Sequence, residues 1–265
     1  MSYSHSTPLK PQGYQYLIAA SAIDDTDPHV YSNPAFNLTL DKPASVDLRP
    51  LCSPVDSQGI LATSASYSFA AAIEFLDNSR NPSSGSTCQV SRLFAYYNER
   101  ILTNAIHNSA GVALKDGIVA LTKHGVCSEA NWPFDPLKLT TVPDQAAYDA
   151  ASYRIGAYAR VLTLDINSIK AVLASNYPVV ISMQVFDSFE GNAVAASGIV
   201  QMPLDGERQL GGHATLIVGY DDITQRVIAR NSWGASWGQG GYFTLPYAYV
   251  THQDLTMDAW VINTY

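Results

Sequence analysis

The chain has 265 residues, of which 47% are hydrophobic and 14% are charged, which predicts a folded protein of one large domain or two tightly packed lobes. Its formal net charge of −8, with 15 lysines and arginines, argues against a nucleic-acid partner and against binding to an anionic membrane. No apolar run is long enough to span a bilayer, and no basic segment followed by an apolar run marks a signal peptide. We therefore expect no transmembrane segment, and a protein that is cytoplasmic or exported without a visible signal peptide.

The first 43 residues are rich in Pro, Ser, Tyr and Asp, and their weak periodicity predicts an extended N-terminal arm. The stretch 14–20 within this arm is too apolar to remain free in water. We expect it to pack along the outside of the body, by adding a strand or covering an apolar patch, and to leave the space between the lobes open. A disordered tail is the alternative, which the polar first twelve residues favour.

Three helices are predicted in the first part of the body. The run 64–78 is apolar on nearly all sides, as is typical of a fully buried helix, and a polar turn cluster follows it. The runs 91–100 and 114–121 are predicted as two further helices.

The second part of the chain is predicted to be mostly strands. It opens with one helix at 166–175, and the segments rich in β-branched and aromatic residues that follow are 179–185, 214–220, 226–230 and 241–245. Helices followed by strands imply an α+β fold with two segregated lobes. We expect a helical lobe over about 44–135 and a β lobe over about 136–265, with a ligand cleft between them.

Three short motifs, far apart in the sequence, stand out from the rest of the chain. Gln58-Gly59 precedes Ser64, which opens the buried helix, and two later motifs are Gly212-His213-Ala214 and Asn231-Ser232-Trp233-Gly234. Taken alone, Ser64 would be an ordinary helix N-cap and His213 a hydrogen-bonded histidine of the core.

Together and in this order, the motifs resemble the papain family of cysteine peptidases, over roughly residues 44 to 250. Segments 91–100 and 116–118 look closer to the bacterial and viral members. The resemblance implies a two-lobe α+β fold, with a helical lobe followed by an antiparallel β-barrel-like lobe. It also implies cleavage of peptide bonds through a covalent acyl-enzyme, and a peptide or protein ligand in the cleft between the lobes. We expect no cofactor and no metal, since no Cys or His pair has the spacing of zinc ligands.

The resemblance assigns a role to each residue of these motifs. Ser64 stands at the place of the nucleophilic cysteine, His213 at that of the general base, and Asn231 at that of the residue that orients the imidazole. Gln58 corresponds to the side chain that helps to stabilise the tetrahedral oxyanion.

Three further residues are candidates for the substrate cleft: Gly111, Gly212 and Trp233. Trp233 is expected to shield the pair of His213 and Asn231 from water. Gly111 either lets the substrate backbone approach closely or is a plain turn glycine.

The serine at position 64 puts the activity in question, because a hydroxyl is a weak nucleophile at its ordinary pKa. Three explanations remain open: a deliberate replacement of cysteine, a protein that has lost peptidase activity, and a working serine hydrolase. The intact Gln58, His213 and Asn231 favour the first. The second is favoured by Ala62-Thr63 and Ala65, which depart from the family pattern, and it implies a catalytically silent module for binding or assembly.

The three cysteines, Cys52, Cys88 and Cys127, are expected to be free thiols. Secreted members of the family usually form a disulfide through a cysteine three residues before the nucleophile. Leu61 occupies that place here.

Overall fold

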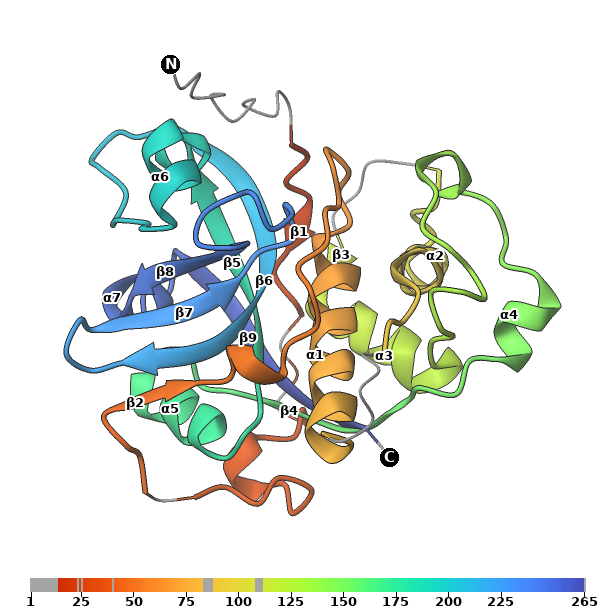
Figure 1. Ribbon diagram of the computed structural model, residues 1–265, viewed down its shortest axis with the longest axis horizontal. Coiled ribbons are helices and arrows are strands. Elements are labelled where there is room, and N and C mark those ends of the chain that lie inside the picture. The colour runs from red at the N-terminus through yellow and green to blue at the C-terminus, as the bar shows by residue number, and fades with distance from the viewer. Residues whose placement is uncertain are drawn as a thin grey trace, which may run out of the picture.

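The computed structural model describes residues 14–22, 24, 26–39, 41–82, 88–107 and 112–264. Two lobes lie side by side, one mainly helical and the other built on a large antiparallel sheet (Figure 1). The fold is therefore of the mixed α+β class, as the sequence predicts.

The helical lobe is organised around α1 (Ser64–Arg80), whose first thirteen residues are all buried. Its other helices are α2 (Arg92–Leu102), α3 (Leu114–His124) and α4 (Gln145–Asp149). The hydroxyl of Ser91 caps α2 by accepting a hydrogen bond from the amide of Phe94, which explains why the helix begins one residue after the predicted start.

Seven strands form the sheet of the β lobe. Along the sheet the order is β4 (Ile155–Arg160), β9 (Thr256–Thr264), β5 (Val179–Phe186), β6 (Gln209–Asp221), β7 (Arg226–Arg230) and β8 (Tyr242–Pro246), and β2 (Ser45–Asp47) also pairs with β6. Within the described ranges the edge strands β4 and β8 do not pair with each other, so the sheet is open rather than a closed barrel.

Short elements complete the two lobes. The β lobe carries α5 (Ile166–Ala174), α6 (Asn192–Ser197) and α7 (Tyr247–Val250), and the single-turn 3-10 helices are η1 (Val30–Ser32), η2 (Arg49–Leu51), η3 (Pro136–Lys138) and η4 (Asp187–Glu190). No helix in the part of the chain that the structure describes is long and apolar enough to cross a membrane.

The arm packs on the body in two different ways. Residues 26–39 lie on the β lobe, where Val30 and Phe36 are buried and the amide of Arg160 donates a hydrogen bond to the carbonyl of Pro28. This part confirms the expected packing on the outside of the body.

Residues 14–22 contradict the expectation that the arm leaves the space between the lobes open. Strand β1 (Ile18–Ala19) pairs in parallel with β3 (Val112–Ala113) of the helical lobe, and Leu17 forms a bridge to Gly212 of β6. Figure 1 shows β1 between α1 and β6. The arm enters this space because both walls offer backbone hydrogen-bonding groups that a short strand can satisfy.

Candidate active site

Ser64 is the first residue of α1 and is almost fully buried. The residue before it, Thr63, occupies the N-cap position and makes no side-chain capping bond, so Ser64 is not the N-cap. Without a side-chain cap, the amides of the first turn concentrate the positive end of the helix dipole at this point. The Ser64 hydroxyl accepts a hydrogen bond of 3.2 Å from the amide of Ala214, the residue after His213.

His213 lies on β6 and is paired with Asn231, the residue after β7. The imidazole Nε2 lies 3.0 Å from Oδ1 of Asn231, and the amide of Ser232 donates to the same oxygen over 2.8 Å. Because this second bond fixes Oδ1 as the acceptor, the neutral imidazole carries its proton on Nε2 and keeps Nδ1 as its basic atom.

The same histidine is a weak base in this protein. Complete burial lowers the pKa of His213 from 6.5 to about 4, although the hydrogen bond to Asn231 acts in the opposite direction. Desolvation has this effect because it penalises the charged imidazolium more than the neutral ring.

Gln58 is buried and is joined to the segment that carries Asn231. Its Oε1 accepts a short hydrogen bond from the hydroxyl of Ser232, and its backbone amide donates to the carbonyl of Ser232 over 2.8 Å. Its Nε2 donates to the carbonyl of Leu61 over 2.5 Å. An amide nitrogen has two hydrogens, so one remains for another acceptor.

The structure therefore brings Gln58, Ser64, His213 and Asn231 into one connected group. Of the expected cleft residues, Trp233 packs at 5.5 Å between ring centroids from His213, and Gly212 precedes the histidine on β6. Gly111 lies outside the described residues.

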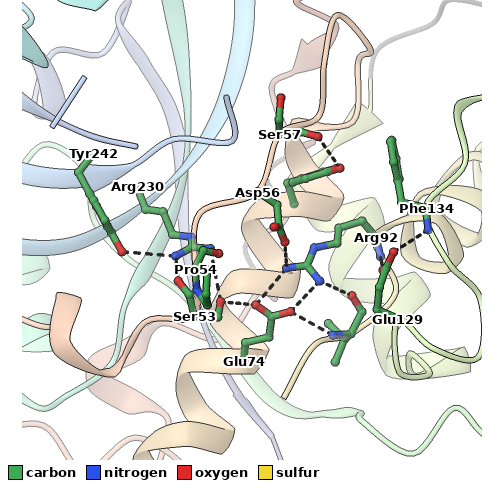
Figure 2. A network of polar contacts seen from close by, with 12 residues as sticks. Ser53, Pro54, Asp56, Ser57, Glu74, Arg92, Glu129, Phe134, Arg230 and Tyr242 are labelled. Atoms are coloured by element: carbon green, nitrogen blue, oxygen red, sulfur yellow. Dashed lines mark hydrogen bonds and ion pairs between the residues drawn. The ribbon is translucent and has the colours of Figure 1, made fainter. Parts of the chain in front are cut away.

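A network of buried charges lies beside this group (Figure 2). Glu74 of α1 is fully buried and forms an ion pair of 2.8 Å with Arg92 of α2. Arg92 forms a second ion pair, also of 2.8 Å, with Asp56. The hydroxyl of Ser53 donates a short hydrogen bond to Glu74. Charges as deeply buried as those of Glu74 and Arg92 are tolerated only when they are paired in this way.

Arg230 connects the network to the β lobe. It ends β7, directly before Asn231, and its guanidinium donates to the carbonyls of Ser53 and Pro54, the latter over 2.6 Å. The carbonyl of Asp56 accepts a bond of 3.1 Å from the amide of Gly234. The segment 53–58, which ends at Gln58, is thus held by groups from both lobes.

The N-terminal arm covers the same site. The ring of Tyr14 stacks on Trp233 with 3.9 Å between centroids and 7° between planes. Tyr16 lies edge-on to His213 at 6.0 Å, and its hydroxyl donates a hydrogen bond of 2.6 Å to Glu190. Sequence patterns assign no role to Glu190, and the apolar character of 14–20 is the one signal that this stretch must pack somewhere.

The three cysteines are not among the residues of this group. Cys52, Cys88 and Cys127 are unpaired, and burial raises the pKa of Cys88 and of Cys127 to about 11. Within the described ranges, no three His, Cys, Asp or Glu side chains gather as a metal site would require.

Comparison with known proteins finds the family that the sequence motifs resemble. The model of the family described as "Papain family cysteine protease" matches residues 43–261. An uncharacterised peptidase C1-like protein of Acanthamoeba polyphaga mimivirus is 40% identical over 230 residues, which are 82% of this chain and 72% of that protein.

Solved structures of cysteine proteases have a similar fold. The crystal structure of xylellain, a cysteine protease from Xylella fastidiosa, has a TM-score of 0.82 and 34% identity, covering 95% of this chain and 97% of that one. The bromelain protease from Ananas comosus, solved in complex with the E64 inhibitor, has a TM-score of 0.63 and 18% identity over 84% of this chain and 100% of its own, which indicates a shared fold alone. The viral and bacterial relatives confirm the expected similarity to bacterial and viral members of the family. The chain belongs to the papain family of cysteine proteases.

Proposed function

We propose that residues 44–265 form a peptidase domain of the cysteine type, and that the chain with Ser64 is inactive or very weak. The observation that carries this proposal is the pair of His213 and Asn231, whose proton position is fixed, beside position 64 at an uncapped helix N-terminus. The ligand is a peptide or protein in the cleft between the lobes.

With a thiol at position 64, each group has a defined role. The thiol passes its proton to Nδ1 of His213, and the resulting thiolate adds to the carbonyl carbon of the peptide bond. The oxyanion is held by Nε2 of Gln58 and the backbone amide of residue 64. The imidazolium of His213 then gives its proton to the departing amine, which leaves an acyl-enzyme. Water hydrolyses this thioester while His213 takes up the water's proton.

A serine at position 64 does not form a stable anion as a thiol does. Its hydroxyl must lose a proton during the attack, and the pKa of His213, lowered to about 4, makes the imidazole a poor acceptor near neutral pH. Loss of one member of such a triad commonly lowers the rate by several orders of magnitude. This argument also disfavours a working serine hydrolase.

The test is the variant Ser64→Cys, assayed on a broad peptide library and on unfolded protein. We expect thiol-dependent hydrolysis, and covalent labelling by an epoxide of the E-64 type, since a relative of the same fold was solved with that inhibitor. The matched control is Ser68→Cys, which makes the same change one turn further along α1 at another buried serine. It should neither hydrolyse peptides nor react with the epoxide.

A catalytically silent module for binding or assembly is the second candidate. It is favoured by the partner of the Ser64 hydroxyl, which is the Ala214 amide rather than the imidazole. If the Ser64→Cys variant folds and shows neither labelling nor hydrolysis, the peptidase proposal fails and the silent module replaces it.

A further inference from the structure

The arm crosses the cleft as an extended strand that contacts both walls. On the helical side, the amide of Gln15 donates to the carbonyl of Ile60 over 3.2 Å, and the amide of Val112 donates to the carbonyl of Leu17 over 2.9 Å. On the β side, Leu17 forms a bridge to Gly212. A backbone that satisfies both walls in this way binds as a peptide ligand does when it adds a strand.

Two glycines on β6 make room for this strand. A Cβ atom at Gly211 would lie 2.6 Å from the carbonyl oxygen of Tyr16, and one at Gly212 would overlap the carbonyl oxygen of Ile18. The wall beside His213 is therefore shaped for the close approach of another backbone.

Two tyrosines give the arm its side-chain contacts with the site. Tyr14 and Tyr16 are two positions apart, so in an extended chain their side chains point to the same face. Tyr14 stacks on Trp233, and the Tyr16 hydroxyl donates to the carboxylate of Glu190 at the end of η4. A hydrogen bond to a carboxylate is stronger than one between neutral groups.

The far end of the segment is tied to both lobes. The amide of Ser21 donates over 3.3 Å to Asp258 of β9, and its hydroxyl accepts a bond of 3.2 Å from the amide of Lys115 of α3. The ammonium of Lys115 also pairs with Asp27 at 2.7 Å. These bonds keep the arm in register while the tyrosines engage.

We infer that Trp233 and Glu190 form a tyrosine-binding subsite of the cleft, and that Tyr14 and Tyr16 of the chain itself fill it. Residues 14–22 thereby close the candidate active site until an extended peptide displaces them. The best competitor is a peptide with tyrosines at alternate positions, because it offers the same ring and hydroxyl. The inference rests on the proposed function in one respect: the cleft that the arm closes is the one that binds peptide.

The first experiment measures amide exchange over residues 14–22 in the full chain that keeps Ser64, so no catalytic chemistry enters. Exchange should be at least tenfold faster in the Tyr14→Ala/Tyr16→Ala variant than in the parent. The control is Tyr31→Ala, which removes an exposed tyrosine of the arm that lies outside the crossing segment and should leave exchange unchanged.

The second experiment follows alkylation of the thiol in Ser64→Cys, quantified at position 64 by peptide mass spectrometry. The two tyrosine substitutions should speed alkylation about tenfold or more. A synthetic peptide of residues 14–22 should restore protection in this opened variant, whereas the same peptide with both tyrosines changed to alanine should not.

A double-mutant cycle isolates the subsite itself. Tyr16→Phe keeps the ring and removes only the hydroxyl, and Glu190→Ala removes only the acceptor. Each should speed exchange of residues 14–22 by a similar factor, and the double variant should add little to either, since both remove one interaction.

The outcomes separate this inference from the proposed function. Equal exchange in the parent and in the tyrosine variant overturns the closed cleft. So does alkylation that is already fast in Ser64→Cys without the tyrosine substitutions. Faster exchange with alkylation slow in every variant supports the tyrosine subsite and contradicts the activated thiol.

Discussion

In the proposed function the chemistry depends on His213, and the surroundings of this residue keep it neutral. It is fully buried, and its polar contact is the amide oxygen of Asn231 rather than a carboxylate. A carboxylate would raise the basicity of the imidazole strongly, whereas the amide of Asn231 orients the ring and offsets only part of the effect of burial. This arrangement suits a nucleophile that supplies its own negative charge, as a thiolate does.

The lowered pKa of His213 predicts a loss of stability in acid. The folded protein binds this proton only near pH 4, whereas the unfolded chain binds it near pH 6.5, so stability falls as pH drops through that window. By pH 4 the loss should reach about 3 kcal/mol. The measurement is the free energy of urea unfolding against pH, for the parent and for His213→Gln.

The difference between the two curves removes the contribution of the carboxylates that titrate in the same range. The parent should lose more stability than His213→Gln between about pH 6.5 and about pH 4. Parallel curves would mean that the imidazole is solvated and that its pKa is not depressed.

At the scale of elements, the charge network decides how the segment before Gln58 is held. Arg92→Met removes one partner of a fully buried carboxylate, so Glu74 is left without its cation. Breaking a buried pair in this way costs about 3 to 5 kcal/mol. Chemical denaturation should therefore show a large drop in the free energy of unfolding.

Arg208→Met is the matched control, because it makes the same change in an exposed pair with Asp187. Exposed pairs contribute about 0 to 1 kcal/mol. Equal effects of the two substitutions would show that the network around Glu74 is hydrated and has no special role.

The sequence predicts the elements whose side chains match their surroundings. Helix α1 is apolar on nearly all sides because it lies between the two lobes, and this is visible in the run from position 64. Strands β4 and β9 escape prediction, since β4 contains glycine and alanine and β9 carries Asp258 in its interior. There the surrounding sheet, rather than local propensity, determines the strand.

In the candidate site, too, some residues can be predicted from the sequence and others cannot. Gln58, Ser64, His213 and Asn231 stand in short motifs with fixed neighbours, so a sequence can reveal them. The bond between Tyr16 and Glu190 joins residues 174 positions apart, and neither belongs to such a motif. Contacts of this kind depend on the path of the folded chain, so the sequence alone places the arm on the outside of the body.

At the scale of the whole molecule, the arm is part of the fold as well as an occupant of the cleft. Deleting residues 1–40 removes the buried side chains of Val30 and Phe36, each of which stabilises the fold by about 1.5 to 3 kcal/mol. A change of ~1 kcal/mol shifts the melting temperature of a domain of this size by about 2 to 4 °C.

We therefore expect the deletion to lower the melting temperature by several degrees, measured by calorimetry. The double change Tyr14→Ala/Tyr16→Ala should lower it far less, because it keeps Val30 and Phe36 in place. An unchanged melting temperature after the deletion would mean that the arm does not contribute to the fold.

The central claim is that a single atom separates this site from that of an active cysteine peptidase. The most direct test is the pH dependence of alkylation of the thiol in Ser64→Cys, in the chain opened by Tyr14→Ala/Tyr16→Ala. The half-buried Cys88 and the buried Cys127, with their raised pKa, react slowly at low pH and serve as internal references. The account predicts rapid alkylation with a midpoint far below about 8.5, the ordinary pKa of a cysteine thiol. A midpoint at or above that value would contradict it.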